Sequence, residues 1–246
     1  MTVPSHHRTT RLLLVDDSPA MRALLRELLS SAADIEVVGE AGDPYEARER
    51  IKALNPDVIT LDVEMPRMDG LSFLDNLMRL RPMPVVMFSS LTARGASASM
   101  SALALGAVAV LQKPRGTSDA ELAESAAALI DAVRGAAQSR PRRKSDVAAV
   151  STAPAKFPDT ELPARRICLI GASTGGTEAI RDLLAAWPLR DVAVLISQHI
   201  PPAFSAPFAE RLDRHSPLHV RHAVSGRPLM AGHAYVAPGG QHLRLA

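Results

Sequence analysis

The sequence is poor in cysteine and aromatic residues, and it has no long hydrophobic run. Cys168 is the single cysteine among 246 residues, so no disulfide can form within the chain and nothing indicates an oxidising compartment. Phe, Trp and Tyr make up 3% of the residues, which leaves few rings for stacking bases. No apolar stretch approaches the ~20 residues that cross a bilayer, and the first ten residues lack the apolar core of a signal peptide. We therefore expect a cytoplasmic protein with no nucleic-acid partner and no membrane insertion.

The residues that are present favour a two-domain α/β protein. Hydrophobic residues make up 47% of the chain, enough to bury two cores, and the net charge of +2 favours no class of charged partner. In the first half, apolar runs alternate with amphipathic segments. One amphipathic segment follows Ser18 and Pro19, two residues that are typical of a helix start. This alternation predicts a doubly wound parallel sheet with five strands and five helices.

Two predicted strands in this half end in acidic residues. Residues 12–15 lead into Asp16 and Asp17, and residues 57–61 lead into Asp62. The carboxyl ends of parallel strands meet at one sheet edge, so we expect the three carboxylates to lie together. Such a cluster repels itself unless a hard divalent cation lies among its oxygens. The sequence therefore predicts a Mg²⁺ site, with Asp17 and Asp62 as direct ligands and Asp16 acting through water.

Two further predicted strands bring a hydroxyl and an ammonium group to the same edge. Residues 84–88 precede Ser89, and residues 107–111 are followed closely by Lys113. Lys113 can neutralise the oxygens of a phosphoryl group that is transferred to Asp62, and Ser89 can hydrogen-bond the product.

Taken in this order, the motifs resemble the receiver domain of bacterial response regulators, over roughly residues 10–134. The matching positions are Asp16-Asp17, Asp62, Met65-Pro66-Arg67-Met68-Asp69-Gly70, Ser89 and Lys113-Pro114. The resemblance implies a five-stranded flavodoxin-like sheet, phosphorylation of Asp62 by a histidine kinase, and a metal ligand from the backbone carbonyl of Glu64. Receivers commonly carry Phe or Tyr three residues before the lysine. This chain has Val110 there, so we do not expect the usual aromatic readout of phosphorylation.

Residues 135–164 are predicted to form an interdomain linker. They are rich in Arg, Pro, Ala, Ser and Thr and have no sustained apolar period. A basic cluster within them consists of Arg140, Arg142, Arg143 and Lys144. It has no interleaved aromatic residues and no helix-turn-helix follows it, so a solvated linker is favoured over a nucleic-acid site.

The second half contains a G-x-S-x-G pattern, Gly171 to Gly175, between a predicted strand and a predicted helix. In that context Ser173 lies on a tight turn and is a candidate nucleophile. The same residues could also form a phosphate-binding loop or a flexible connection. A second buried strand, residues 192–196, leads to His199, which would lie at the same sheet edge and within reach as a general base. The other seven histidines fall in the polar leader or in segments that resemble helix ends and loops.

Residues 165–246 resemble the start of the catalytic domain of the chemotaxis protein-glutamate methylesterase (CheB) family. The matching runs are Ile170-Gly171-Ala172-Ser173-Thr174-Gly175-Gly176-Thr177-Glu178-Ala179-Ile180, Ser197-Gln198-His199-Ile200-Pro201-Pro202 and Gly232-His233-Ala234-Tyr235-Val236-Ala237-Pro238-Gly239. The resemblance implies a Rossmann-like serine hydrolase that removes glutamyl methyl esters from methyl-accepting chemoreceptors and deamidates receptor glutamines. A chemotaxis histidine kinase would be the phosphodonor. Ser173 would attack the ester, His199 would take its proton, and the Thr174 amide would bind the oxyanion.

The chain departs from this family at its end, because it stops at Ala246 before the aspartate that orients the histidine. Five acids in this half lie in predicted helices or before a strand and do not replace that aspartate: Glu178, Asp182, Asp191, Glu210 and Asp213. We therefore expect a partial domain of about three strands with little or no activity. Two hypotheses remain: a phosphorylation-gated methylesterase, or a non-catalytic response regulator that acts as a phosphate sink or binds kinase or receptor.

Overall fold

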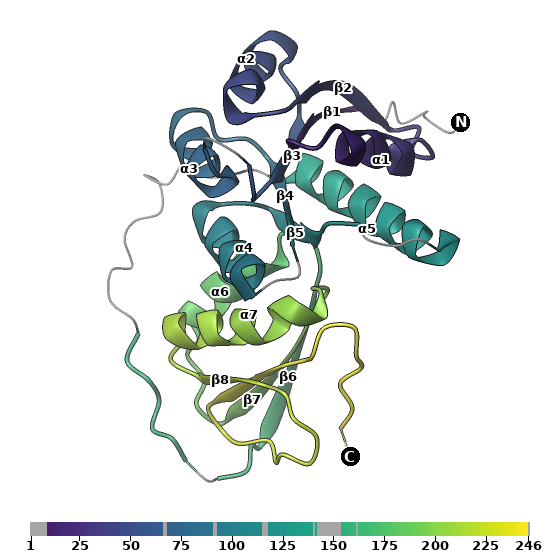
Figure 1. Ribbon diagram of the computed structural model, residues 1–246. Helices are drawn as coiled ribbons and strands as arrows, with labels where there is room; N and C mark the ends of the chain where they lie inside the picture. The colour runs from purple at the N-terminus through teal and green to yellow at the C-terminus, as the bar shows by residue number, and fades with distance from the viewer. Residues whose placement is uncertain are drawn as a thin grey trace, which may run out of the picture. The chain divides into compact units, whose positions relative to one another are not determined.

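The computed structural model describes residues 9–65, 68–90, 93–114, 118–139, 141, 154–160 and 162–245. These residues form two compact units, each built around its own parallel sheet (Figure 1). The predicted basic cluster, at residues 140 and 142–144, lies outside the described residues. Within the described part of the chain, no helix has the length and apolar character needed to span a bilayer.

The first half of the chain alternates strands and helices. Its elements are β1 (Thr10–Val15), α1 (Pro19–Leu29), β2 (Ile35–Ala41), α2 (Pro44–Leu54), β3 (Val58–Asp62), α3 (Gly70–Leu80), β4 (Val85–Ser89), α4 (Ala93–Leu105), β5 (Ala109–Gln112) and α5 (Asp119–Gln138). The strand order is β2-β1-β3-β4-β5 with every pairing parallel, which confirms the predicted flavodoxin-like sheet. In Figure 1, α1 and α5 lie on one side of the sheet, and α2 and α3 on the other.

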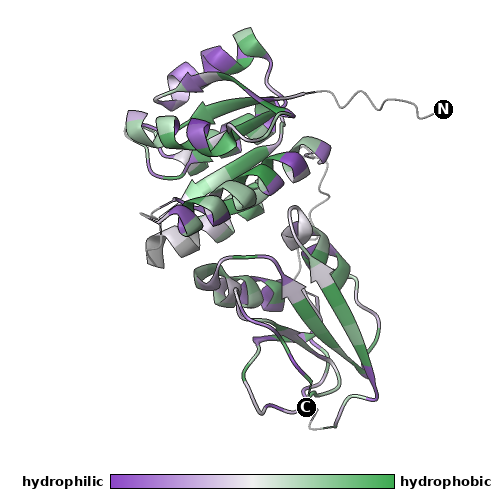
Figure 2. Ribbon diagram, turned by 90° about the vertical axis from the view of Figure 1, so that its right-hand side faces the viewer, coloured by the Kyte–Doolittle hydropathy of each residue, from purple (hydrophilic) through white to green (hydrophobic). Residues whose placement is uncertain are grey.

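Local sequence accounts for these elements. Ser18 accepts a hydrogen bond from the Met21 amide, and Pro19 occupies the first turn of α1. All residues of β3 and β4 are buried, as expected for strands covered on both faces. Figure 2 shows mainly hydrophobic colour on the strands and mixed colour on the helices, so the core of each unit lies along its sheet.

The second unit contains four strands rather than about three. Its elements are β6 (Arg166–Ala172), α6 (Gly176–Ala185), β7 (Val192–Gln198), α7 (Pro202–His215), β8 (His219–His222) and β9 (His233–Val236). The order is β6-β7-β9-β8, again all parallel. Three histidines assigned to helix ends or loops thus lie on strands, namely His219, His222 and His233. Exposure alternates along most of β6, and Leu169, on the more open face, is 71% exposed.

Part of the predicted linker is bound to the second unit. The Phe157 amide donates to the carbonyl of Pro217 at 2.7 Å, and the Ala164 amide donates to Leu229 at 3.0 Å. Lys156 Nζ donates to Asp213 Oδ1 at 2.7 Å. Composition does not reveal these contacts, because most of them go to backbone atoms of distant residues.

Candidate functional sites

The three clustered aspartates follow β1 and β3, which are neighbours in the first sheet. Ligand oxygens of Asp16, Asp17 and Asp62 all lie within 4.8 Å of one another. Asp16 and Asp62 are buried, whereas Asp17 is exposed. The structure therefore brings together the three carboxylates that the sequence predicts at this edge.

Lys113 closes the same site from the end of β5. Its Nζ lies 2.7 Å from Asp62 Oδ2 and 3.1 Å from Asp16 Oδ2. Burial raises the pKa of Asp62 to about 6; the charge of Asp16 adds to this effect, while the hydrogen bond from Lys113 opposes it. Burial lowers the pKa of Lys113, but its hydrogen bond to Asp62 and the two carboxylate charges outweigh this and raise it. One ammonium group thus faces two buried carboxylates.

The residues present suit a hard divalent cation. Asp16 Oδ2 is buried and receives no hydrogen bond of normal geometry, although the Lys113 ammonium is close to it. Carboxylate oxygens are the ligands that Mg²⁺ prefers, and the exposed Asp17 leaves a side from which a hydrated ion can enter. The Glu64 amide donates to Asp62 Oδ1 at 3.2 Å, so Glu64 also lies at the site.

The other residues predicted for the first site lie near it. Ser89 ends β4 and is fully buried; its hydroxyl donates to the Ser90 carbonyl at 3.4 Å. Val110 is buried on β5. The roles of Ser89 in binding phosphate and of the Glu64 carbonyl in binding metal stay predictions.

Ser173 and His199 are brought together by the pairing of β6 with β7. In this register Ala172 is opposite Gln198, so both strands end just before the two candidate residues. Ser173 Oγ lies 3.4 Å from His199 Nδ1, and the His199 amide donates to the Ala172 carbonyl at 2.8 Å. Both candidate residues are exposed. The distance is at the long end for a hydrogen bond, as is common for catalytic pairs without substrate.

The turn after Ser173 holds the serine at the start of α6. Gly175 has φ +76°, a left-handed conformation that glycine adopts without strain. The Gly176 amide donates to the Ser173 carbonyl at 2.8 Å, which closes the turn around Thr174. Backbone amides at a helix start attract anions, so the predicted oxyanion role of Thr174 is compatible with its position.

Four of the five acids that the sequence analysis considered as partners for His199 pair with basic residues. The pairs are Glu178 with Arg211 at 2.5 Å, Asp182 with Arg181 at 2.6 Å, Asp191 with Arg166 at 2.7 Å, and Asp213 with Lys156 at 2.7 Å. Within the described residues, no carboxylate is paired with His199. The expectation that these acids do not complete a triad stays a prediction.

Sequence reasoning missed Gln198, which is the last residue of β7 and directly precedes His199. Its Nε2 donates to the Ser173 carbonyl at 2.8 Å and to the His199 carbonyl at 3.1 Å. The available signal was an amide side chain at the end of a predicted buried strand, directly before the candidate base.

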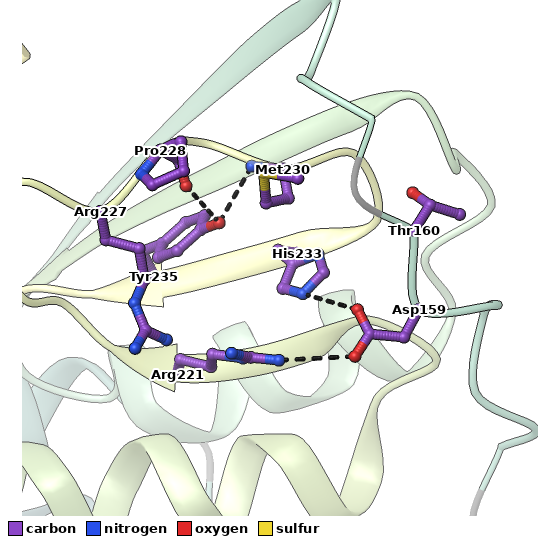
Figure 3. Close-up of a pocket in the computed structure, with 8 residues that line it drawn as sticks. All are labelled: Asp159, Thr160, Arg221, Arg227, Pro228, Met230, His233 and Tyr235. Atoms are coloured by element: carbon purple, nitrogen blue, oxygen red, sulfur yellow. Dashed lines mark hydrogen bonds and ion pairs between the residues drawn. The ribbon is translucent and has the colours of Figure 1, made fainter.

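A separate pocket lies at the start of β9 (Figure 3). His233 Nε2 lies 3.3 Å from Asp159 Oδ1, and Arg221 lies 3.6 Å from Asp159 Oδ2. Burial lowers the pKa of His233; Arg221 and His219 add to this effect, while the Ala231 carbonyl and Asp159 oppose it. Ser173 and His199 follow the carboxyl ends of their strands, so this pocket is at the opposite end of the parallel sheet from the Ser173–His199 pair.

Comparison with known proteins identifies both units. Residues 12–126 match the response regulator receiver domain, and residues 168–246 match the family described as CheB methylesterase. A protein-glutamate methylesterase/protein-glutamine glutaminase 2 from Xanthomonas oryzae is 52% identical over 96% of this chain and 68% of its own length. The protein-glutamate methylesterase/protein-glutamine glutaminase from Salmonella typhimurium is 49% identical over 96% of this chain and 67% of its own length.

Among solved structures, the response regulator domain of Thermotoga maritima CheB is 41% identical to this chain. The match covers 55% of this chain and all of that domain, with a TM-score of 0.49. Together, the two family matches and the relatives that share nearly the whole chain show that it belongs to the receiver-containing CheB protein-glutamate methylesterase/protein-glutamine glutaminase family.

Proposed function

We propose that this protein is a phosphorylation-regulated methylesterase in which Ser173 is the nucleophile and His199 the general base. The observation that carries the proposal is the Ser173 Oγ to His199 Nδ1 distance of 3.4 Å, at adjacent strand ends of the methylesterase domain. The substrate is a glutamyl methyl ester of a chemoreceptor, and receptor glutamines are deamidated by the same route.

The reaction proceeds through an acyl-serine. Ser173 Oγ attacks the ester carbonyl while His199 takes its proton, and amides at the start of α6, with Thr174 first, stabilise the oxyanion. The carbon–methoxy bond breaks, and the leaving group departs as methanol with the proton from His199. Water then attacks the acyl carbon with His199 as base, releasing the glutamate side chain and restoring Ser173. With a glutamine substrate, ammonia leaves in place of methanol.

The receiver domain supplies the regulation. A histidine kinase transfers a phosphoryl group to Asp62, whose carboxylate is held by Lys113 and the Glu64 amide. Asp16, Asp17 and Asp62 would hold Mg²⁺, together with the Glu64 carbonyl. The ion would neutralise phosphoryl oxygens during transfer. The Lys113 ammonium would also offset the negative charge of the phosphoryl oxygens, and Ser89 would hydrogen-bond the phosphorylated product.

The test is covalent labelling of Ser173 by a fluorophosphonate, alongside methanol release from a methyl-esterified chemoreceptor. Labelling forms the Ser173 Oγ–P bond and expels fluoride, while the hydroxyl proton passes to His199. Ser173→Ala should abolish labelling, and His199→Ala should slow it strongly because nucleophile and base act as a unit. Ser225→Ala, at an exposed serine of the same unit, is the matched control.

Methanol release by residues 1–246 should be slow, because no carboxylate among the described residues is paired with His199, and a serine hydrolase whose histidine is not oriented by an acid loses on the order of 10⁴-fold in rate. Labelling that persists in Ser173→Ala would overturn the assignment of the nucleophile. A chain that is phosphorylated but neither labels nor releases methanol would favour the non-catalytic response regulator instead.

A further inference from the structure

Gln198 connects the two residues of the proposed catalytic pair through their backbones. Its Nε2 donates to the carbonyl of Ser173 on the turn after β6 and to the carbonyl of His199 after β7. The two distances, 2.8 and 3.1 Å, are those of normal hydrogen bonds. One primary amide, with two protons, therefore serves two acceptors from different strands.

The amide is held firmly in this orientation. Gln198 is 8% exposed. Its Oε1 packs against Gly176, where a Cβ atom would lie 2.5 Å from that oxygen and 2.6 Å from Ala172 Cβ. Reversing the amide would put Oε1 against two carbonyl oxygens, so the two acceptors fix which end of the group faces the catalytic turn.

This arrangement has a cost that a merely structural residue would avoid. Gln198 Oε1 is buried without a hydrogen-bond partner among the described residues. An unsatisfied buried acceptor costs about 1–3 kcal/mol, and an apolar side chain of similar length would avoid it. The compensating feature is the link between the segments that carry Ser173 and His199.

We propose that Gln198 is a positioning residue for the esterase reaction, which sets the approach of Ser173 Oγ to His199 by holding both backbones in register. The inference rests on the proposed function of Ser173 and His199. Its physical basis is that small errors in the placement of a nucleophile and its base reduce the rate of the chemical step without changing how a ligand first binds.

The test uses the full chain and the dependence of labelling rate on fluorophosphonate concentration. Gln198→Met keeps the length of the side chain without a donor, and Gln198→Glu keeps its shape but offers oxygens to the two carbonyls. Each should lower the maximal labelling rate constant about 10- to 100-fold while the half-saturating concentration stays unchanged. Gln241→Leu, at an exposed glutamine of the same unit, should leave both constants unchanged.

Thermal unfolding monitored by circular dichroism identifies which variants are folded. A folded Gln198 variant that labels as fast as the parent would overturn the positioning role and leave the proposed function intact. A change confined to the half-saturating concentration would also overturn it, because it would place Gln198 in ligand binding. Labelling that does not depend on Ser173 would overturn both proposals together.

Discussion

At the scale of single residues, Asp62 differs from its two acidic neighbours in its contacts. Lys113 is closer to Asp62 than to Asp16, and the Glu64 amide donates to the other oxygen of Asp62. Asp17 is exposed and accessible to a hydrated ion. These contacts are compatible with Asp62 as the phosphoacceptor, while the metal-binding roles of Asp16, Asp17 and Asp62 stay predictions.

We expect Asp62→Asn to abolish phosphorylation by a small phosphodonor in Mg²⁺. The substitution removes the attacking oxygen's charge and leaves the fold of β3 intact. Mass spectrometry of the intact protein measures the added phosphoryl group. Glu49→Gln, at an exposed acid on α2, should be phosphorylated like the parent. A phosphorylated Asp62→Asn protein would contradict the assignment.

A second prediction at the scale of single residues concerns the pH dependence of stability. The pKa of His233 lies below the ordinary histidine value. Between that ordinary value and the lowered folded value, the unfolded chain binds a proton that the folded protein does not. Stability of the second unit should therefore fall as pH falls below about 6.5. The substitution His233→Asn removes the titrating group and keeps a donor for the Ala231 carbonyl. It should therefore reduce the loss of stability at low pH.

Urea unfolding followed by Trp187 fluorescence measures the effect, since this single tryptophan lies in the second unit. We compare the parent, His233→Asn and the exposed control His242→Asn at about pH 7.5 and about pH 5. Equal losses of unfolding free energy in all three proteins would show that His233 does not contribute.

At the scale of elements, the connection between β3 and α3 depends on Gly70. A Cβ atom at this position would lie 2.0 Å from the Asp62 carbonyl oxygen. The Gly70 amide also donates to the Val63 carbonyl at 2.9 Å, so α3 begins directly against the strand end that carries Asp62. The glycine allows the close approach of helix and site.

Gly70→Ala should therefore destabilise the first unit by about 1–3 kcal/mol, as other overpacked sites do, and slow phosphorylation of Asp62. Gly42→Ala is the matched control, because its Cβ would make only contacts of 3.6 and 3.8 Å. Urea unfolding followed by far-ultraviolet circular dichroism measures both variants. A Gly70→Ala protein as stable as Gly42→Ala would contradict this account.

At the scale of the whole molecule, the structure bears on the length of the linker between the two units. α5 extends to Gln138, and residues 154–160 are bound to the second unit. Lys156 Nζ also donates to the Leu218 carbonyl at 2.7 Å, so this lysine is held by several oxygens. The segment that separates the units is thus shorter than the predicted 135–164.

We expect limited trypsin digestion to cut first among the basic residues at 140–144, before it cuts after Lys156. A protease needs an extended, accessible backbone, and the hydrogen bonds of Lys156 and Phe157 hold theirs against the second unit. The masses of early fragments give the cleavage sites. Asp213→Asn should expose Lys156 to earlier cleavage. A parent protein cut first after Lys156 would refute the docking of this segment.

The sequence by itself determined the parallel sheets and the residues gathered at their carboxyl edges. Buried strands read as continuous apolar runs, and each polar residue after such a run must lie at the same edge as the others. Asp16, Asp62 and Lys113 could therefore be placed together, as could Ser173 and His199. These inferences need only local patterns and the direction of the strands.

Only the tertiary structure decided which contacts join distant segments. The strand that starts at His219 has four residues with mixed polarity, so its pairing with β9 has no local signal. Lys156 docks through oxygens of Asp213 and Leu218, and Gln198 acts through two backbone carbonyls. Backbone acceptors are the same at every position of a sequence. Which of them a side chain reaches therefore depends on the folded arrangement of the chain.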